Sequence, residues 1–174
     1  MEKLYLPPES ITEQEHETLR VVRIKMKEEN PMFPENCCAV TAQVIQELLN
    51  WEMVGVRCKL QRIVDSDSYL NGYRRHANNR HPKGFLVDTT LEQFDYRKMG
   101  FLDGSVAEDA SSELHRAIGN GIPAIALLEE YTPFFEKDEM AQLELDHAGM
   151  DISTMIVLHR INPKKYRHPY KPEL

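Results

Sequence analysis

The chain has few cysteines: three among 174 residues, and two of them, Cys37 and Cys38, are neighbours. Adjacent cysteines pair only with strain, so a fold held together by disulfides is excluded. The sequence also lacks an apolar run close to the roughly 20 residues that cross a bilayer, and residues 1–9 lack the pattern of a signal peptide. We therefore expect reduced thiols, no membrane partner and a cytoplasmic location, and the sequence leaves secretion as an effector open.

Positive charge is scarce as well. Lys and Arg number 21 against 28 Asp and Glu, so the formal net charge is −7. This sign disfavours phosphate-backbone binding, and we expect no nucleic-acid partner. Hydrophobic residues make up 41 % and charged residues 28 %, which is typical of a globular chain. Without repeats or biased tracts, residues 1–174 are expected to form a single domain with an extended tail over 162–174.

Two helices are predicted in the first third of the chain. Ser10 and Glu13 have the spacing of a capping box, which predicts a helix of about 18 residues that ends before Pro31. From Cys37 onward, a second apolar stripe at helical spacing predicts a second helix that is buried on one side. The residues on the two stripes are Leu19, Val22 and Met26, then Val40, Thr41, Val44, Ile45, Leu48 and Leu49.

The pattern changes to that of strands after Gly55. Val56, Cys58 and Leu60 alternate with polar residues, as in a half-buried strand. Further strands are predicted at 85–87, 122–128 and 152–158, and a short helix at 111–118. Helices followed by antiparallel strands indicate an α+β fold, with N-terminal helices packed on an antiparallel sheet.

A cysteine at the start of a helix is the first candidate for chemistry. Unpaired backbone N–H groups and the positive end of the helix dipole favour the thiolate there, and the thiolate is the nucleophile. Cys37 and Cys38 both fit this position. A buried cysteine that only packs as a small hydrophobic residue is the competing interpretation.

A histidine and an aspartate form the second candidate. Pro82 is six residues from both His76 and Asp88, so a hairpin folded about Pro82 would place the two opposite each other. Directly paired residues have Cβ atoms about 4.5 to 5.5 Å apart, which would let Asp88 accept the imidazole N–H and stabilise the imidazolium. The alternative is a polar, solvated hairpin in which Asp88 only ends a strand and caps the next turn.

Other histidines and a metal site are weaker candidates. His81 falls in the predicted turn, an odd number of residues from Asp88, and His147 and His159 have no obvious orienting carboxylate. Cys37, Cys38 and Cys58 lack the spacing of zinc ligands, because no Cys-x-x-Cys occurs. We expect no metal and no cofactor.

Two motifs resemble a family of small, largely uncharacterised bacterial proteins of the YunG type. Cys-Ala-Val-Thr-Ala at 38–42 is similar to the start of that family's nucleophile helix. The second motif, His-x-x-Asn-Arg-x-Pro-x-Gly-x-x-Val-Asp-x-Thr-x-Glu-Gln-Phe, is matched in order and spacing from His76 to Phe94. Together they cover about a third of the chain and include every candidate selected on physical grounds.

The resemblance implies a papain-like or transglutaminase-like fold in which a helix-borne Cys faces a His and an Asp on adjacent strands. It places the nucleophile at Cys38, with His76 as base and Asp88 as its orienting residue. Asn36 is a weak candidate for an oxyanion donor, and Gln93 for a residue that lines the site. Asn78 departs from the family pattern, which has an aromatic residue at that position.

The function expected from these residues is acyl transfer by a thiol, with a thioester intermediate and a protein, peptide or small amide as substrate. Water as acceptor would give hydrolysis or deamidation and an amine would give transfer, and the sequence contains no residue that decides between them. The alternative is a binding module that keeps the scaffold without turnover, motivated by Asn78. The sequence leaves the oligomeric state open.

Overall fold

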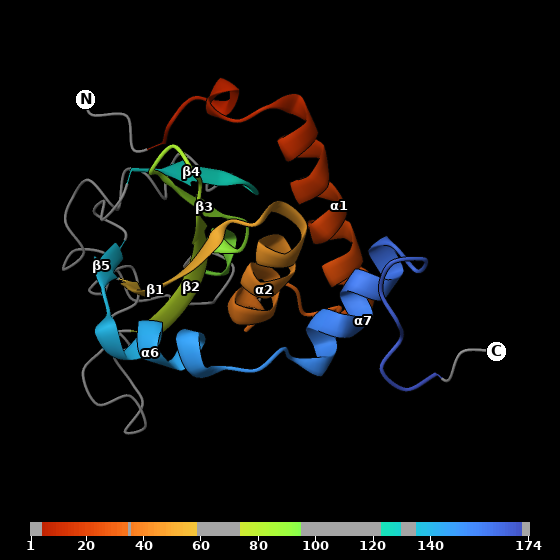
Figure 1. Cartoon of the computed structure of the whole chain (residues 1–174). Coiled ribbons are helices and arrows are strands. Elements are labelled where there is room, and N and C mark those ends of the chain that lie inside the picture. The colour runs from red at the N-terminus through yellow and green to blue at the C-terminus, as the bar shows by residue number, and fades with distance from the viewer. Residues whose placement is uncertain (1–4, 35, 59–73, 95–122, 130–134, 172–174) are drawn as a thin grey trace.

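The computed structural model describes residues 5–34, 36–58, 74–94, 123–129 and 135–171. Within these ranges the chain is α+β, as predicted, with helices packed on an antiparallel sheet (Figure 1). The helices are α1 (Glu13–Glu29), α2 (Cys38–Leu49), α6 (Glu139–His147) and α7 (Ile152–Ile161), with short 3-10 turns η1 (Pro8–Ser10) and η2 (Leu91–Phe94). The strands are β1 (Glu52–Cys58), β2 (Arg74–Arg80), β3 (Leu86–Asp88), β4 (Ala126–Leu128) and β5 (Phe135–Lys137).

Helix α1 begins two residues later than the predicted capping box. The structure uses Thr12 and Glu15: the Thr12 side chain accepts from the Glu15 N–H at 3.1 Å, and the Thr12 N–H donates to Glu15 Oε2 at 2.8 Å. Ser10 cannot take this role because it ends the turn η1, whose conformation starts at Pro8. The predicted length is nearly right, since α1 covers 17 residues.

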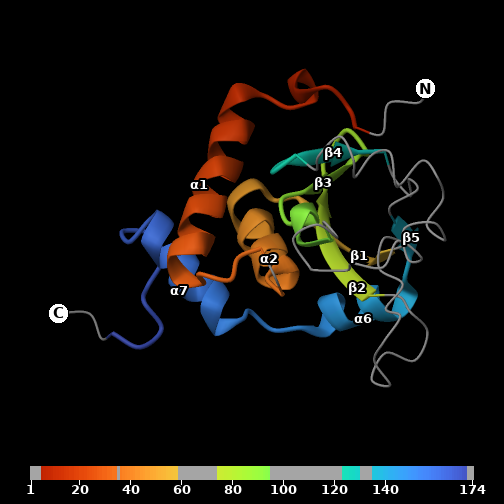
Figure 2. The same cartoon turned by 180° about the vertical axis from the view of Figure 1, so that it is seen from behind.

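Strand β2 is the centre of the sheet, whose order is β4-β3-β2-β1-β5. Its neighbours β1 and β3 both run antiparallel to it, with Gly55 opposite Ala77 and Val87 opposite Asn79. Helices α1, α2 and α7 lie together beside one face of this sheet (Figures 1 and 2). The main apolar core forms between them and includes Val87 among its strand residues.

Helix α6 crosses β1 at Gly55. A Cβ atom at Gly55 would lie 2.4 Å from the backbone nitrogen of Gln142, so only glycine allows this approach. Strand β5 pairs with β1 at 56–58, and the Gln142 side chain continues the pairing beyond it. Its Oε1 accepts from the Gly55 N–H at 2.9 Å and its Nε2 donates to the Met53 carbonyl at 3.2 Å. A side-chain amide therefore satisfies backbone groups that a longer β5 would have met.

Residues 152–158 form a helix, so the predicted strand there is wrong. The Asp151 side chain accepts from the Ser153 N–H at 2.8 Å and caps α7. The buried residues Thr154, Val157 and Leu158 follow at intervals of three and one, which is helical spacing. The β-branched residues in this segment favour a strand locally, but packing of that stripe against α1 and α2 decides the outcome.

The other predicted strands are found with different bounds. Strand β3 begins one residue later than predicted, and β4 occupies the last three residues of the predicted 122–128. Strand β1 contains Val56 and Cys58, whereas Leu60 and the predicted helix at 111–118 lie outside the described residues. Helix α6 and strand β5 had no counterpart in the prediction.

The end of the chain folds back instead of extending directly from α7. The N–H groups of Lys165 and Tyr166 both donate to the Asn162 carbonyl, at 3.1 and 3.0 Å. Tyr166 is half-buried against the apolar core, and its carbonyl accepts from His159 Nδ1 at 2.7 Å. The expected extended tail is thus a turn held to α7 over these residues.

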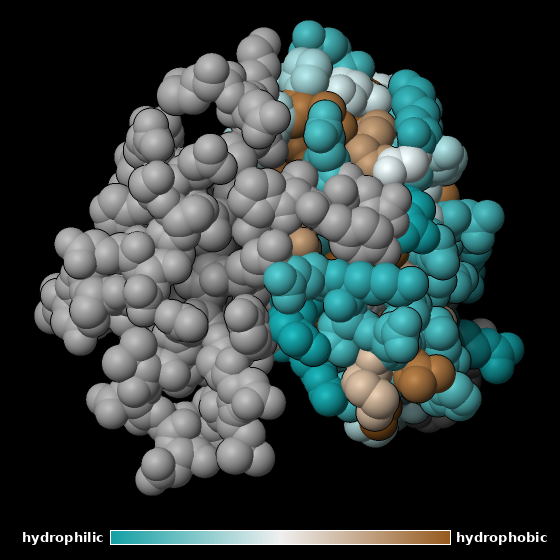
Figure 3. All heavy atoms as spheres, turned by 90° about the vertical axis from the view of Figure 1, so that its left-hand side faces the viewer, coloured by the Kyte–Doolittle hydropathy of each residue, from teal (hydrophilic) through white to brown (hydrophobic). Residues whose placement is uncertain are grey.

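Hydrophilic side chains cover most of the described surface on the side that Figure 3 shows, with small apolar areas near its lower edge and in its upper part. Among the described helices, none combines the length and apolar composition that crossing a membrane requires. The exposed apolar side chains include Met140 and Leu143 on α6.

Candidate functional site

Cys38 is the first residue of α2 and is half-buried. The residue before it, Cys37, makes no side-chain hydrogen bond to the first turn of the helix. The first backbone N–H groups of a helix have no acceptor within that helix. Their partial positive charge therefore lies next to the thiol of Cys38, where it favours an anion.

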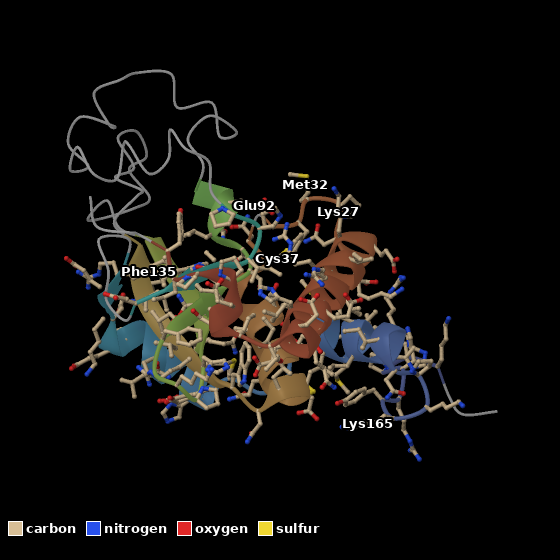
Figure 4. The ribbon with its side chains drawn as sticks, turned by 90° about the horizontal axis from the view of Figure 1, so that it is seen from above. Lys27, Met32, Cys37, Glu92, Phe135 and Lys165 are labelled. Carbon is tan, nitrogen blue, oxygen red and sulfur yellow. The ribbon has the colours of Figure 1, made fainter. Side chains whose placement is uncertain are left out.

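The adjacent thiol of Cys37 has a different environment. Cys37 is buried in the apolar core, and its sulfur accepts from Asn30 Nδ2 at 3.1 Å. Burial raises the pKa of Cys37, although the Asn30 hydrogen bond acts in the other direction. Figure 4 labels Cys37, which directly precedes α2. Of the two cysteines that the sequence left open, the structure buries Cys37 and leaves Cys38 partly accessible.

His76 and Asp88 are in contact. His76 Nε2 lies 2.6 Å from Asp88 Oδ2, and both side chains are buried. The predicted register is nevertheless wrong by two residues, because Asn79 pairs with Val87 and Arg80 with Leu86. The same register continued by one step places Asp88 opposite Asn78, so His76 reaches Asp88 diagonally.

The turn between the two strands explains this shift. Gly84 has a φ of 98°, and the His81 N–H donates to the Phe85 carbonyl at 2.8 Å. The turn is therefore centred on Lys83 and not on Pro82, because the positive φ needed next to it is available to glycine. A shift of two residues preserves the face of the strand, so the side chains still meet.

Asp88 is held in place by its own turn and by α1. Its Oδ1 accepts from the Thr90 N–H at 2.8 Å, which leaves Oδ2 for His76. Arg23 of α1 donates to the Thr89 carbonyl at 2.5 Å and pairs with Glu92 at 2.5 Å. The segment that carries the Asp88 carboxylate is thereby anchored to α1.

The electrostatics of Cys38 and His76 favour an ion pair. Burial of the Cys38 thiol raises its pKa, but attraction to the His76 imidazole, a hydrogen bond with it and another from the Ala77 N–H outweigh burial, so the pKa of Cys38 is lowered. Burial likewise opposes charge on His76, yet the Asp88 carboxylate and the Cys38 thiol raise the pKa of His76 to about 10. The site therefore stabilises a thiolate next to an imidazolium.

The pattern of contacts explains how Cys38 reaches this position. Strand β3 pairs with β2 at Asn79 and Arg80, and it ends at Asp88. The Ala77 N–H further along β2 acts on the Cys38 thiol and lowers its pKa. The start of α2 therefore lies beside β2 at the position that β3 would occupy if it continued past Asp88.

Two residues near the site had no signal in the sequence. Phe135 of β5 stacks on the His76 ring, with centroids 5.4 Å apart and an interplanar angle of 15° (Figure 4). Tyr5 lies near Asp88: burial and the charge of that carboxylate raise the pKa of Tyr5 to about 12. Both are far in sequence from the residues that they approach, so no local spacing could have revealed them.

The two weaker candidates have different surroundings. Asn36 is exposed in the turn before α2, with a φ of 56°. Gln93 is buried in η2, where its Nε2 donates to the Thr90 carbonyl at 3.0 Å. Gln93 therefore makes a local hydrogen bond next to the Asp88 turn.

His81 has a structural role in the turn. It is buried and stacks on Phe85, with centroids 4.5 Å apart. Its Nδ1 accepts from the Lys83 N–H at 3.1 Å, and its Nε2 faces Glu15 at 3.2 Å. Nδ1 thus stabilises the turn itself, and Nε2 joins the β2–β3 turn to α1.

The remaining histidine candidates bond to backbone. His147 Nδ1 bonds the Leu143 carbonyl within α6 at 2.8 Å, and His159 joins α7 to the returning tail through Tyr166. Over the described ranges, no three His, Cys, Asp or Glu side chains are grouped so that they could hold a metal ion.

Comparisons of the chain with models of protein families, with curated proteins and with solved structures find no match.

Proposed function

We propose that the protein is a cysteine-dependent acyl-transfer enzyme of papain-like or transglutaminase-like type. Cys38 is the nucleophile, His76 the acid and base, and Asp88 the residue that orients His76. The observation that carries the proposal is a partly buried cysteine at a helix start, with a lowered thiol pKa, beside a buried imidazole that lies 2.6 Å from a carboxylate.

The reaction follows from this arrangement. The Cys38 thiolate attacks the carbonyl carbon of an amide, and the C–S bond forms as the carbonyl electrons move to oxygen. Backbone N–H groups of the first turn of α2, that of Cys38 among them, stabilise this oxyanion. His76 gives its proton to the departing nitrogen, which leaves as an amine or ammonia, and a thioester remains on Cys38.

The second half of the reaction returns the enzyme to its starting state. An acceptor, water or an amine, gives a proton to His76 and attacks the thioester carbonyl. The C–S bond breaks, and the product is an acid or a new amide. The substrate is a protein, a peptide or a small amide, and hydrolysis, deamidation and transfer all use the same steps. A binding module without turnover has less support, because it needs neither the accessible thiol nor its lowered pKa.

Alkylation of Cys38 by iodoacetamide as a function of pH tests the proposal. Tandem mass spectrometry locates the label on Cys37 or on Cys38 within their shared peptide, so Cys37 serves as an internal control. We expect the Cys38 rate to reach its plateau at a lower pH than a model thiol, because the thiolate is populated above a lowered pKa. Cys37, whose pKa is raised by burial, should react slowly throughout. A Cys38 that reacts like glutathione at every pH would contradict the mechanism.

A further inference from the structure

Two adjacent asparagines on β2 differ in how their side chains are satisfied. Asn79 is buried, and its Nδ2 donates to the carbonyls of Ala42 and Trp51 at 3.0 and 3.4 Å. Asn78 is equally buried, with 3 % of its surface exposed. Within the described part of the chain, neither its Nδ2 nor its Oδ1 has a hydrogen-bond partner.

The surroundings of Asn78 make this unusual. Strand geometry places Asn78 on the same face of β2 as His76, opposite Val54 of β1. Register and alternation assign a set of fully buried apolar residues to this face: Val56, Leu86, Ala126, Leu128 and Phe135. The carboxamide therefore lies among apolar side chains, next to the His76–Asp88 pair.

A buried amide without a partner costs stability, because its groups lose hydrogen bonds to water and gain none in the protein. Leucine has nearly the same size and would avoid this cost. A buried polar group that destabilises the fold in this way needs an explanation. A ligand that completes the hydrogen bonds of Asn78 is one explanation, and the position of Asn78 next to His76 supports it.

We propose that Asn78 is a specificity-determining residue that binds an amide group of the substrate. Its side chain offers both a donor and an acceptor, and an amide is the group that satisfies both at once. Two residues along a strand are roughly 7 Å apart, so the recognised amide lies a few bonds beyond the carbonyl that Cys38 attacks. The preferred acyl donor is thus a peptide or another chain with a second amide. This inference depends on the proposed function.

Two matched chloromethyl ketones test the inference. N-acetylglycine chloromethyl ketone carries an amide beyond its ketone, and butyl chloromethyl ketone has a hydrocarbon of the same length in its place. In both cases the Cys38 sulfur displaces chloride and forms a C–S bond, which mass spectrometry assigns to Cys38. The rate with each probe is divided by its rate with glutathione, and the ratio of the two results is the amide preference.

We expect wild-type protein to prefer the amide probe by at least about fivefold, as one or two hydrogen bonds would give. In Asn78→Leu and Asn78→Ala this preference should fall to about one, and Asn78→Leu should not melt at a lower temperature than wild type. A preference retained in either variant that folds would overturn the inference, and so would the absence of a preference in wild type. If Cys38 of the wild type reacts with both probes no faster than glutathione, the proposed function itself fails.

Asn79→Leu is the matched control. It removes a buried asparagine from the neighbouring position, but one whose amide bonds the backbone of α2 and Trp51. We expect a lower melting temperature with the amide preference unchanged. If Asn79→Leu lost the preference as Asn78→Leu does, the effect would be a general disturbance of β2, and the assignment to Asn78 would be wrong.

Discussion

The two faces of β2 differ in what their polar groups do. On the face toward α2, Asn79 is buried with its amide nitrogen bonded to backbone carbonyls. On the other face, His76 is held in a charged contact with Asp88, and the Asn78 amide has no hydrogen-bond partner among the residues that the structure describes. Successive side chains of a strand point in opposite directions, so one strand can join the sheet to its helices and also present reactive groups. Changes on the two faces should therefore separate stability from reactivity.

The largest expected effect on reactivity is that of His76→Gln. Without the imidazolium, burial still raises the pKa of Cys38 and the main opposing interaction is gone. At neutral pH we expect the alkylation rate of Cys38 to fall roughly 100-fold, since each unit of thiol pKa changes the thiolate fraction about tenfold. Rapid-quench alkylation measures the rate. An unchanged rate in a folded variant would show that His76 does not activate the thiol.

On the helix-facing side, Gly55→Ala should cause the largest loss of stability. Gly55 lies opposite Ala77 of β2, and a methyl group there meets the backbone of α6. Because backbone must move, we expect the free energy of unfolding to fall by about 1 to 3 kcal/mol in urea titrations. Gly149→Ala is the control, since nothing lies within 4 Å of a Cβ at that position. Equal effects of the two changes would refute the close crossing of α6.

Asp88→Asn should have a smaller effect on reactivity, and we expect its clearest sign at alkaline pH. The carboxylate is a main cause of the raised pKa of His76, which is about 10 in the wild type. Its removal lowers this pKa, so the imidazolium is lost at a lower pH, and this loss sets the upper limit of the pH range in which the ion pair exists. The Asp88 charge also raises the pKa of Cys38, so its removal lets the thiolate form at a lower pH as well. We expect the upper limit of the range to move down by at least about one pH unit. Titration of the His76 ring by NMR measures it, and an unmoved upper limit would argue against the coupling.

The smallest effect expected is that of Phe135→Leu. The change keeps an apolar residue but removes the ring that stacks on His76. Stacking is worth about 0.5 to 1.5 kcal/mol beyond burial, so we expect a few-fold slower alkylation of Cys38. The pH profile of the alkylation rate distinguishes lost stacking from looser packing around His76. Weaker stacking on the imidazolium lowers the pKa of His76, whereas looser packing alone leaves the profile unchanged. A slower rate with an unchanged profile would indicate packing alone.

Much of the framework was predictable because it depends on local spacing. Leu19, Val22 and Met26 form the buried stripe of α1, and α2 begins at the predicted cysteine pair. The contact between His76 and Asp88 was predicted as well, although with the wrong register. The predicted face of each side chain is still right, because a shift of two residues along a strand leaves a side chain on the same face of the sheet.

The errors occur where neighbours distant in sequence decide the outcome. Residues 152–158 have the composition of a strand, yet contact with α1 and α2 favours the helix. The contact of Phe135 with His76 follows from the pairing of β5 with β1, which no local pattern reveals. The choice between Cys37 and Cys38 was also open on physical grounds, because either could begin the helix.

The sequence by itself determined the residue types and their short-range order: a thiol at a helix start, and a histidine and a carboxylate on either side of one turn. Tertiary structure alone decided which thiol is buried, how the start of α2 meets β2 beyond the end of β3, and which asparagine amide has no hydrogen-bond partner within the described ranges. The physical reason is that helix and strand periodicity act over a few residues, whereas burial and the electrostatic environment depend on segments brought together only by folding.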